Sequence, residues 1–262
     1  MSDDSRPSPV RRPADSAAED RAHTRTAAVI PAAGRGVRLG PGAPKALRAL
    51  GGTPMLIHAV RAMAASRGVS LVVVVAPPDG AAEVRSLLDA HALPERTDFA
   101  VVPGGETRQD SVRLGLDALP PEYGIVLVHD AARPLVPVDT VDAVIEAVRE
   151  GAPAVVPAVP LADTVKQVEP AEVPGAPEPV VATPERARLR AVQTPQGFDR
   201  ETLVRAHATV TEDVTDDASM VERMGPAVVV VPGHEEAFKV TRPLDLVLAE
   251  AVLARRRLND GF

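Results

Sequence analysis

The sequence predicts an α/β domain built on a mainly parallel β-sheet. From residue 27 onward, short runs rich in valine and isoleucine alternate with segments of helical periodicity, the pattern of βαβ units. The 262 residues suffice for one large domain with a full core, and are few for two independent enzymatic domains. We therefore expect one domain over residues 27–262. Residues 1–26, rich in serine, proline and charge, are expected to form a disordered tail.

Strands and helices follow from the apolar pattern. Strands are expected at 27–32, 71–76, 99–102, 125–129, 154–158 and 227–231. Thr53 is predicted to cap a helix that begins at Pro54, Asp79 to cap the next, and Asp139 to open a third. A last helix should follow Pro243. The apolar stripes of these helices are expected to be core: Met55, Leu56, Ala59, Val60 and Met63; Val84, Leu87 and Leu88; Val141, Val144, Ile145 and Val148; and Leu244, Val247, Leu248, Ala251 and Val252.

The alternation of strand and helix patterns is interrupted at about residues 160–190, where prolines recur. Each proline fixes φ and removes a backbone donor, so a compact helix is disfavoured there. An extended arm or a long loop is expected instead. Long excursions from a compact domain are often functional or used in assembly.

Composition excludes several classes of function. With 29 basic and 36 acidic residues the net charge is −7, and without a dense basic run we expect no nucleic-acid partner. The absence of cysteine excludes disulfides, thiolate metal sites and a cysteine nucleophile. The apolar runs are too short to cross a bilayer, and nothing resembles the apolar core of a signal peptide. We expect a cytoplasmic protein without a membrane partner.

The segment 29–45, VIPAAGRGVRLGPGAPK, is the most informative part of the chain. Glycines allow backbone N–H groups to approach phosphate oxygens closely, and the interleaved cations neutralise charge. The dinucleotide fingerprint does not fit, because the sixth position after the start at Gly34 holds Leu39. A Walker A loop does not fit either, because Lys45 precedes alanine instead of serine or threonine. The segment predicts a polyphosphate ligand without naming the chemistry.

Two further segments follow expected strands and carry charged residues. In VHDAARP at 128–134, Asp130 ends a strand near the predicted phosphate loop, where a carboxylate can hold Mg²⁺. His129 is interpreted as a packed strand residue. In AFKVTRP at 237–243, a short strand is expected to present Lys239. Ligands of open parallel sheets sit at the carboxyl ends of the strands, so these segments should converge.

Taken in order, the motifs resemble the 2-C-methyl-D-erythritol 4-phosphate cytidylyltransferase family of the non-mevalonate isoprenoid pathway. The resemblance runs from about residue 26 to the end. It rests on PAAGRGVRL at 31–39, PK at 44–45, GGETRQDSV at 104–112, VHDAARP at 128–134, DTVK at 163–166, QTPQGF at 193–198, TDDAS at 215–219 and FKVTRPLD at 238–245.

The resemblance implies a Rossmann-like nucleotidyltransferase fold of the GT-A-like type. This fold is a three-layer sandwich with a mainly parallel sheet and an extended dimerisation arm, here within a single cytidylyltransferase domain. Such enzymes use CTP and Mg²⁺ to transfer a cytidylyl group to the sugar-alcohol phosphate, and they release pyrophosphate. A homodimer is expected, with the arm reaching the second subunit.

The resemblance also assigns roles to individual residues. Arg38, Lys45 and Lys239 are expected to be catalytic cations, the first two clamping the triphosphate and the third reaching the α-phosphate. The remaining assignments are these: nucleotide binding by Ala32, Ala33, Gly34, Gly104, Gly105, Asp110 and Ser111; metal binding by Asp130; and methylerythritol phosphate binding by Asp130, Arg133, Thr164, Arg186 and Thr194. Thr164 and Arg186 are expected to serve the neighbouring subunit's site.

Some positions depart from the family pattern, and other functions stay open. Ala46 stands where the family usually has glutamine, and Glu235 or Glu236 aligns only approximately with a second acid. Asp216 and Asp217 are interpreted as structural caps or loop anchors. A cytidylyltransferase for another polyol phosphate, such as ribitol 5-phosphate, shares most motifs. A non-catalytic nucleotide-binding module and a dinucleotide-binding oxidoreductase are the alternatives from other classes.

Overall fold

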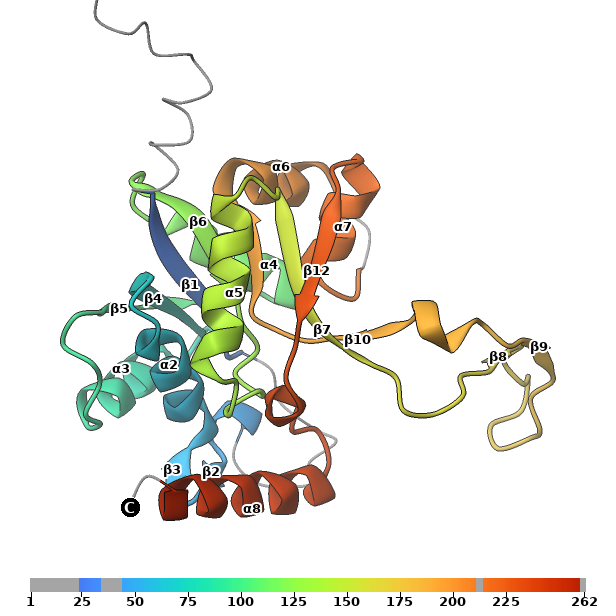
Figure 1. Cartoon of the computed structure of the whole chain (residues 1–262). Coiled ribbons are helices and arrows are strands. Elements are labelled where there is room, and N and C mark those ends of the chain that lie inside the picture. The colour runs from blue at the N-terminus through green and yellow to red at the C-terminus, as the bar shows by residue number, and fades with distance from the viewer. Residues whose placement is uncertain (1–23, 34–43, 211–213, 260–262) are drawn as a thin grey trace, which may run out of the picture.

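The computed structural model describes residues 24–33, 44–210 and 214–259, which form an α/β sandwich around a central sheet (Figure 1). The strands of this sheet are β1 (Arg25–Pro31), β4 (Val69–Ala76), β5 (Asp98–Pro103), β6 (Tyr123–Val128), β7 (Ala154–Pro160), β10 (Arg190–Val192), β11 (Gln196–Asp199) and β12 (Val228–Pro232). Their order is β10-β7-β11-β6-β1-β4-β5, with β12 paired to β7. β1, β4, β5 and β6 pair in parallel, as do β7 and β12, whereas β10 and β11 run antiparallel to their neighbours. The predicted mainly parallel sheet is confirmed.

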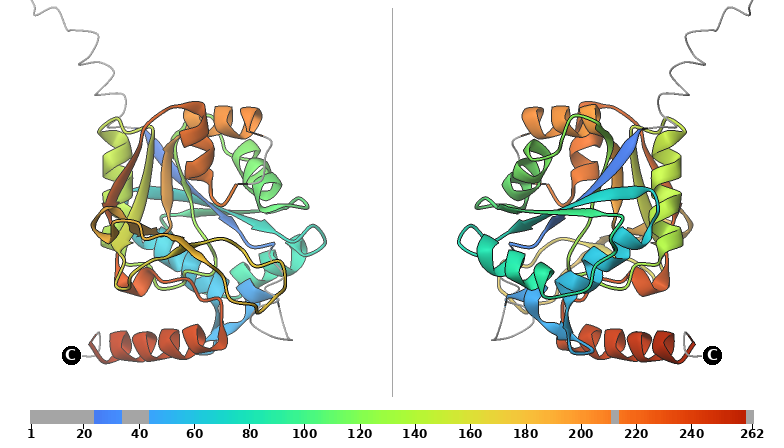
Figure 2. Two further views of the ribbon diagram at one scale, coloured as in Figure 1. Left: turned by 90° about the vertical axis from the view of Figure 1, so that its right-hand side faces the viewer. Right: turned by 90° about the vertical axis from the view of Figure 1, so that its left-hand side faces the viewer.

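Helices cover both faces of the sheet and give the expected three layers (Figure 2). One face packs against α2 (Met55–Ala65), α3 (Ala81–Asp89) and α5 (Val138–Arg149), and the other against α4 (Arg108–Asp117), α6 (Arg200–Thr209) and α7 (Asp217–Met224). A smaller apolar cluster joins α8 (Pro243–Asn259) to the hairpin of β2 (Ala49–Leu50) and β3 (Thr53–Pro54). Short 3₁₀ turns occur at η2 (Lys45–Leu47), η3 (Arg186–Arg188) and η4 (Glu235–Ala237).

The predicted helix starts were wrong in detail. Pro54 belongs to β3 and lies outside α2. Gly80 occupies the N-cap position of α3, so Asp79 is not its cap. α5 begins at Val138, which places Asp139 inside its first turn. None of these helices has a side-chain cap, so packing of the apolar face decides where each begins.

Most of the core stripe predicted for α8 was also wrong. Leu244, Val247 and Leu248 are 76%, 66% and 51% exposed, and Ala249 is the one buried residue of the helix. The face of α8 that packs against the hairpin instead carries Leu246, Ala249, Val252 and Leu253, so of the expected stripe Val252 alone contacts this cluster within the described helix. The expected strand around Lys239 does not form either: η4 is followed by an irregular segment, which touches the loop after β6 through one backbone bond, Val240 N–H to the Ala132 carbonyl.

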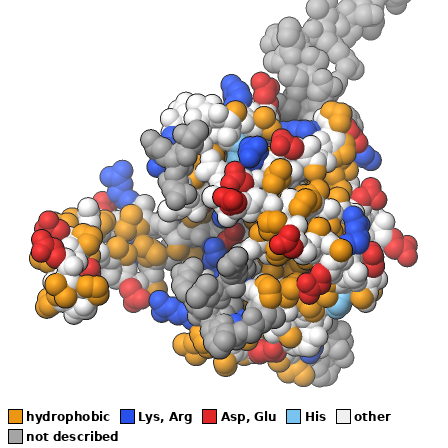
Figure 3. All heavy atoms as spheres, turned by 180° about the vertical axis from the view of Figure 1, so that it is seen from behind, with side chains coloured by type: hydrophobic (Ala, Val, Ile, Leu, Met, Phe, Trp, Pro, Cys, Tyr) orange, Lys and Arg blue, Asp and Glu red, His pale blue; other side chains and the backbone are white. Residues whose placement is uncertain are grey.

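The expected arm between β7 and β10 is present. It projects from the sandwich and carries the small β8 (Gln167–Val168) and β9 (Val180–Ala182) ladder, followed by η3 (Figure 1). Hydrophobic side chains are visible on the projecting arm in Figure 3, and Val173, Val180 and Val181 are each more than half exposed. In the described part of the chain, no helix has both the length and the apolar character needed to cross a membrane.

Candidate active site

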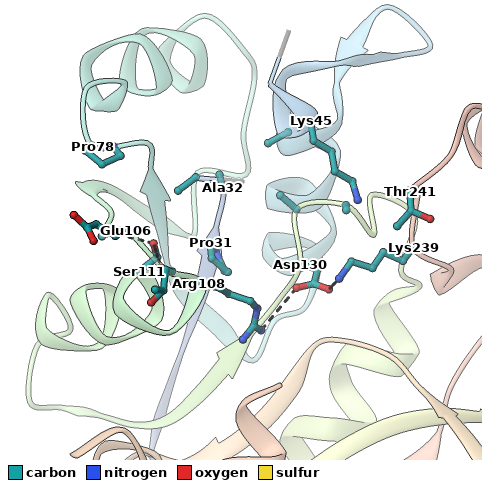
Figure 4. Close-up of a pocket in the computed structure, with 16 residues that line it drawn as sticks. Pro31, Ala32, Lys45, Pro78, Glu106, Arg108, Ser111, Asp130, Lys239 and Thr241 are labelled. Carbon is teal, nitrogen blue, oxygen red and sulfur yellow. Dashed lines mark hydrogen bonds and ion pairs between the residues drawn. The ribbon is translucent and has the colours of Figure 1, made fainter. Parts of the chain in front are cut away.

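A cavity of about 620 Å³ opens at the carboxyl ends of the parallel strands (Figure 4). Its walls come from the end of β1, from η2, from the start of α4, from the loop after β6 and from the segment before α8. The lining residues are Pro31, Ala32, Ala33, Lys45, Ala46, Pro78, Gly105, Glu106, Thr107, Arg108, Ser111, Asp130, Ala131, Ala132, Lys239 and Thr241. The predicted convergence of segments far apart in the sequence is therefore confirmed.

Asp130 lies at the centre of a cluster of cations. One carboxylate oxygen lies 2.8 Å from Lys239 Nζ and 3.9 Å from Arg133 Nε, and the other lies 3.8 Å from Arg108 Nη2. Burial opposes ionisation of the carboxyl group, but Lys239 and Arg108 outweigh it and lower the pKa of Asp130 to about 2. Near neutral pH the cavity therefore holds an ionised carboxylate between opposite charges.

Arg133 supports the segment that carries Lys239. Its Nη1 donates to the Ala237 carbonyl at 2.8 Å, and its Nη2 donates to the Val192 carbonyl at 3.2 Å. Desolvation by burial lowers the pKa of Arg133, although Asp130 opposes the shift. Arg133 is not among the residues that line the cavity. Its guanidinium instead supports the backbone behind the cavity wall, at Ala237 and Val192.

His129 and Thr194 fix the backbone just before this cluster. His129 is completely buried, which lowers its pKa to about 4 and keeps it neutral near pH 7. Its Nε2 lies 3.1 Å from the Arg133 carbonyl, which can only accept, so Nδ1 accepts from the Thr194 hydroxyl at 3.0 Å. The Thr194 hydroxyl also accepts from the Asp130 N–H at 3.0 Å. The interpretation of His129 as a packed residue is confirmed, and Thr194 lies behind the cavity wall.

The glycine pair before α4 is held by the helix start. Thr107 and Asp110 form a capping box, and the Ser111 hydroxyl accepts from the Gly105 N–H at 3.2 Å while donating to the Thr107 carbonyl. A Cβ at Gly104 would lie 2.8 Å from the Ala76 carbonyl oxygen, so only glycine fits there. Gly105 and Ser111 line the cavity, whereas Gly104 and Asp110 do not.

Arg108 is a cation of the cavity lining to which sequence reasoning assigned no role. It is the first residue of α4, and its Nη1 lies 2.7 Å from a carboxylate oxygen of the buried Asp217. Desolvation opposes its charge, but Asp217 and Asp130 raise the pKa of the guanidinium. The Thr107-x-x-Asp110 spacing is a capping-box signal that could have located this helix start, and with it Arg108, beside the predicted Gly104–Gly105 turn.

Thr164 and Arg186 lie on the arm and are both exposed, and neither lines the cavity. Arg186 donates to the Ala162 carbonyl within the arm itself. Gly34 and Arg38 lie outside the described residues. The structure therefore brings Ala32, Ala33, Lys45, Gly105, Ser111, Asp130 and Lys239 together in one cavity and leaves the arm residues apart.

The approximate second acids do not join Asp130. The Glu236 carboxylate pairs with Arg255 and Arg256 of α8, and Glu235 is exposed. Asp216 caps α7 by accepting from the Ser219 N–H at 3.0 Å, which confirms its structural interpretation. Within residues 24–33, 44–210 and 214–259, no group of three or more histidine or acidic side chains could hold a metal ion by itself.

Comparisons with known proteins show the family of the chain. The family model for 2-C-methyl-D-erythritol 4-phosphate cytidylyltransferase matches residues 26–255. The chain is 88% identical to the Streptomyces coelicolor protein of that name over the full length of both, and 86% identical to the one from Streptomyces avermitilis, again over both full lengths. The crystal structure of that enzyme from Thermus thermophilus superposes with a TM-score of 0.66 at 35% identity, over 86% of this chain and 97% of that one. The chain therefore belongs to the 2-C-methyl-D-erythritol 4-phosphate cytidylyltransferase family.

Proposed function

We propose that the protein transfers the cytidylyl group of CTP to 2-C-methyl-D-erythritol 4-phosphate and releases pyrophosphate. The observation that carries this proposal is the cavity itself, which gathers Lys45, Arg108 and Lys239 around the ionised Asp130. Such a site suits two polyanionic substrates. A non-catalytic nucleotide-binding module would not need this arrangement of charges. A dinucleotide-binding oxidoreductase is disfavoured because the chain lacks the glycine spacing of the dinucleotide fingerprint.

The reaction needs positioning and charge stabilisation more than proton transfer. An oxygen of the methylerythritol phosphate bonds to the α-phosphorus of CTP, and the bond from that phosphorus to the bridging oxygen of the β-phosphate breaks. The attacking phosphate has a second pKa of about 6, so it is largely deprotonated near neutral pH without a general base. The cations hold the two anions together and stabilise the charge that develops on the departing pyrophosphate.

Within this proposal, each group of site residues has its own role. Lys45 and Arg38 clamp the triphosphate, and Lys239 reaches the α-phosphate. Backbone groups of Ala32, Ala33 and Gly34 contact phosphates, and the Gly104–Gly105 turn with Ser111 surrounds the cytidine. The hydrogen bonds of Asp110, Arg133 and Thr194 support the cavity walls, so these three side chains would act by holding the framework.

The residues fit a bound Mg²⁺ at Asp130. Mg²⁺ in phosphate-transferring sites is commonly held by one or two carboxylates, with substrate phosphates and water completing its octahedron. Asp130 is the ionised carboxylate at the centre of the cavity, and Lys239 and Arg108 lie beside it to take up phosphate oxygens. When bound, the ion neutralises charge on the triphosphate.

We further propose that residues 27–262 act as one catalytic domain in a homodimer joined through the arm. A two-stranded ladder is at best marginally stable alone, yet β9 exposes Val180 and Val181, which a second copy would cover. The arm holds Thr164 and Arg186 away from their own cavity, which supports a role for both in the neighbouring site.

Release of pyrophosphate from CTP tests the activity. The protein with Mg²⁺ is given methylerythritol phosphate, ribitol 5-phosphate or no acceptor, and pyrophosphate is measured with time. We expect turnover with methylerythritol phosphate and little with the other two. A strong preference for ribitol 5-phosphate would overturn the substrate, and no turnover with any polyol phosphate would overturn the activity.

A further inference from the structure

A chain of charged and polar groups leads from the buried pair His207 and Asp217 through Arg108 into the cavity. His207 of α6 lies with Nε2 3.0 Å from one oxygen of Asp217, at the start of α7. The other oxygen of Asp217 lies 2.7 Å from Arg108 Nη1, and Arg108 Nη2 lies 3.8 Å from Asp130. Figure 4 shows the last link, with the Arg108 side chain pointing toward Asp130.

Asp217 is unusual because it is an acidic residue whose side chain is only 1% exposed. Burial opposes ionisation, yet hydrogen bonding from His207 and the charge of Arg108 outweigh it and lower the pKa of Asp217. A buried ion pair is weak evidence of a gain in stability, since desolvation cancels much of the attraction. Such a pair does fix direction, because a carboxylate holds a guanidinium in a defined orientation.

Anchoring α7 does not by itself require Asp217. Asp216 already caps the helix, and Gln196 of β11 joins its side-chain amide to Asp216 and its side-chain oxygen to the Ala218 N–H. Asp217 instead joins helices α6 and α7 to a side chain of α4 that lines the cavity.

We propose that Asp217 and His207 are positioning residues that hold the Arg108 guanidinium in the cavity, where it orients the Asp130 carboxylate. Arg108 faces one oxygen of Asp130 and Lys239 faces the other. Loss of Asp217 would let the Arg108 side chain turn away and leave Asp130 held from one side. This inference rests on the proposed cytidylyl transfer, which supplies its assay.

A double-mutant cycle tests the chain of contacts. We expect Asp217→Asn and Arg108→Ala each to lower kcat/KM by about 10- to 100-fold, the effect of losing a charge-assisted hydrogen bond in a site. The double variant should be no worse than Arg108→Ala, because Asp217 acts only through Arg108. Asp199→Asn is the matched control, since Asp199 caps α6 without touching the cavity, and it should keep near-normal kcat/KM. Multiplying losses in the double variant would overturn the proposal.

Chemical rescue of activity separates a positioning role of Asp217 from a purely structural one. Added guanidinium chloride at millimolar concentration should restore activity to Arg108→Ala, because the ion can bind between Asp217 and Asp130. It should not rescue the double variant. Equal rescue of both would contradict the proposal, as would unchanged activity of Arg108→Ala in the presence of an active wild-type enzyme. An inactive wild-type enzyme would instead refute the proposed function.

A pair of His207 variants tests the outer link and serves if Asp217→Asn does not fold. Glutamine and leucine are of similar size, but only glutamine can donate to Asp217. His207→Gln should therefore keep several-fold more activity than His207→Leu at similar melting temperature. Equal activities of the two variants would remove His207 from the chain.

Discussion

The cavity and the arm present their functional side chains in opposite ways. In the cavity, charged residues are held by partners behind them: Arg108 by Asp217, and the segment of Lys239 by Arg133. On the arm, which projects from the sandwich, Thr164 and Arg186 are exposed, Thr164 just before the small β8–β9 ladder and Arg186 in η3 after it. The charged side chains of the cavity are therefore held by contacts within the subunit, whereas those of the arm project away from the sandwich.

This difference indicates what each region contributes to a site. Electrostatic stabilisation of a transition state needs groups that are in place before the reaction, and a buried framework provides them. The arm's exposed valines and prolines instead suit a segment whose final environment comes from elsewhere. The following experiments, in order of expected effect, test whether that contrast holds.

The largest effect is expected from removing the charges at the centre of the cavity. Asp130→Ala and Lys45→Ala should each lower kcat/KM by about 100-fold or more, because charge stabilisation in the cavity is lost. Steady-state pyrophosphate release and circular dichroism measure activity and folding. Glu83→Gln, on the exposed face of α3, is the control and should behave as wild type. Near-normal rates for either cavity variant would contradict its assigned role.

The arm is tested by complementation between two inactive variants. Arg186→Ala and Lys239→Ala should each lose activity. If Arg186 acts in the partner's site, an equimolar mixture should recover about a quarter of wild-type activity, since half the dimers are mixed and each has one intact site. Subunit exchange is verified by mixing tagged and untagged protein. No recovery despite exchange would place Arg186 in its own site or in none.

The framework behind the cavity is tested with Arg133→Met. The Ala237 and Val192 carbonyls lose their donor, so the free energy of unfolding should fall by about 1–3 kcal/mol. kcat/KM should fall as well, because the segment of Lys239 is released. Urea denaturation measures the first effect, and Arg67→Met, at an exposed position, is the matched control. Unchanged stability would show that Arg133 does not brace the framework.

The smallest effect concerns the link between α8 and the cavity loops. Burial opposes ionisation of Glu236, but hydrogen bonds from Arg256 and Arg255 outweigh it and lower the pKa of Glu236 below the ordinary value of 4.5. Its contribution is therefore present above pH 4.5 and is lost as pH falls through the lowered value. Glu236→Gln should cost about 1 kcal/mol near pH 7 and less near pH 3, measured by urea denaturation. An equal cost at both pH values would exclude the charge as its origin.

Sequence reasoning predicted the regular parts of the fold because they depend on local patterns. The buried strands appear as valine-rich runs, and the proline-rich stretch appears as an arm. The helices α4, α6 and α7 were not predicted, since their apolar stripes are short. Exact helix starts were predicted wrongly, because tertiary packing decides where a helix begins. The exposed stripe of α8 shows the converse, because periodicity indicates an amphipathic face without indicating what covers it.

The candidate site divides in the same way. Local motifs were enough to predict the glycine-rich loop, the acid at the end of β6, the lysine before α8 and the family to which their order belongs. No local motif shows that Arg108 joins the acid and the lysine, or that Asp217 and His207 lie behind Arg108, because both are more than 90 residues away from it along the chain. The reason is physical: a motif records which groups a site needs, whereas the partner of a buried charge depends on which elements the fold packs together.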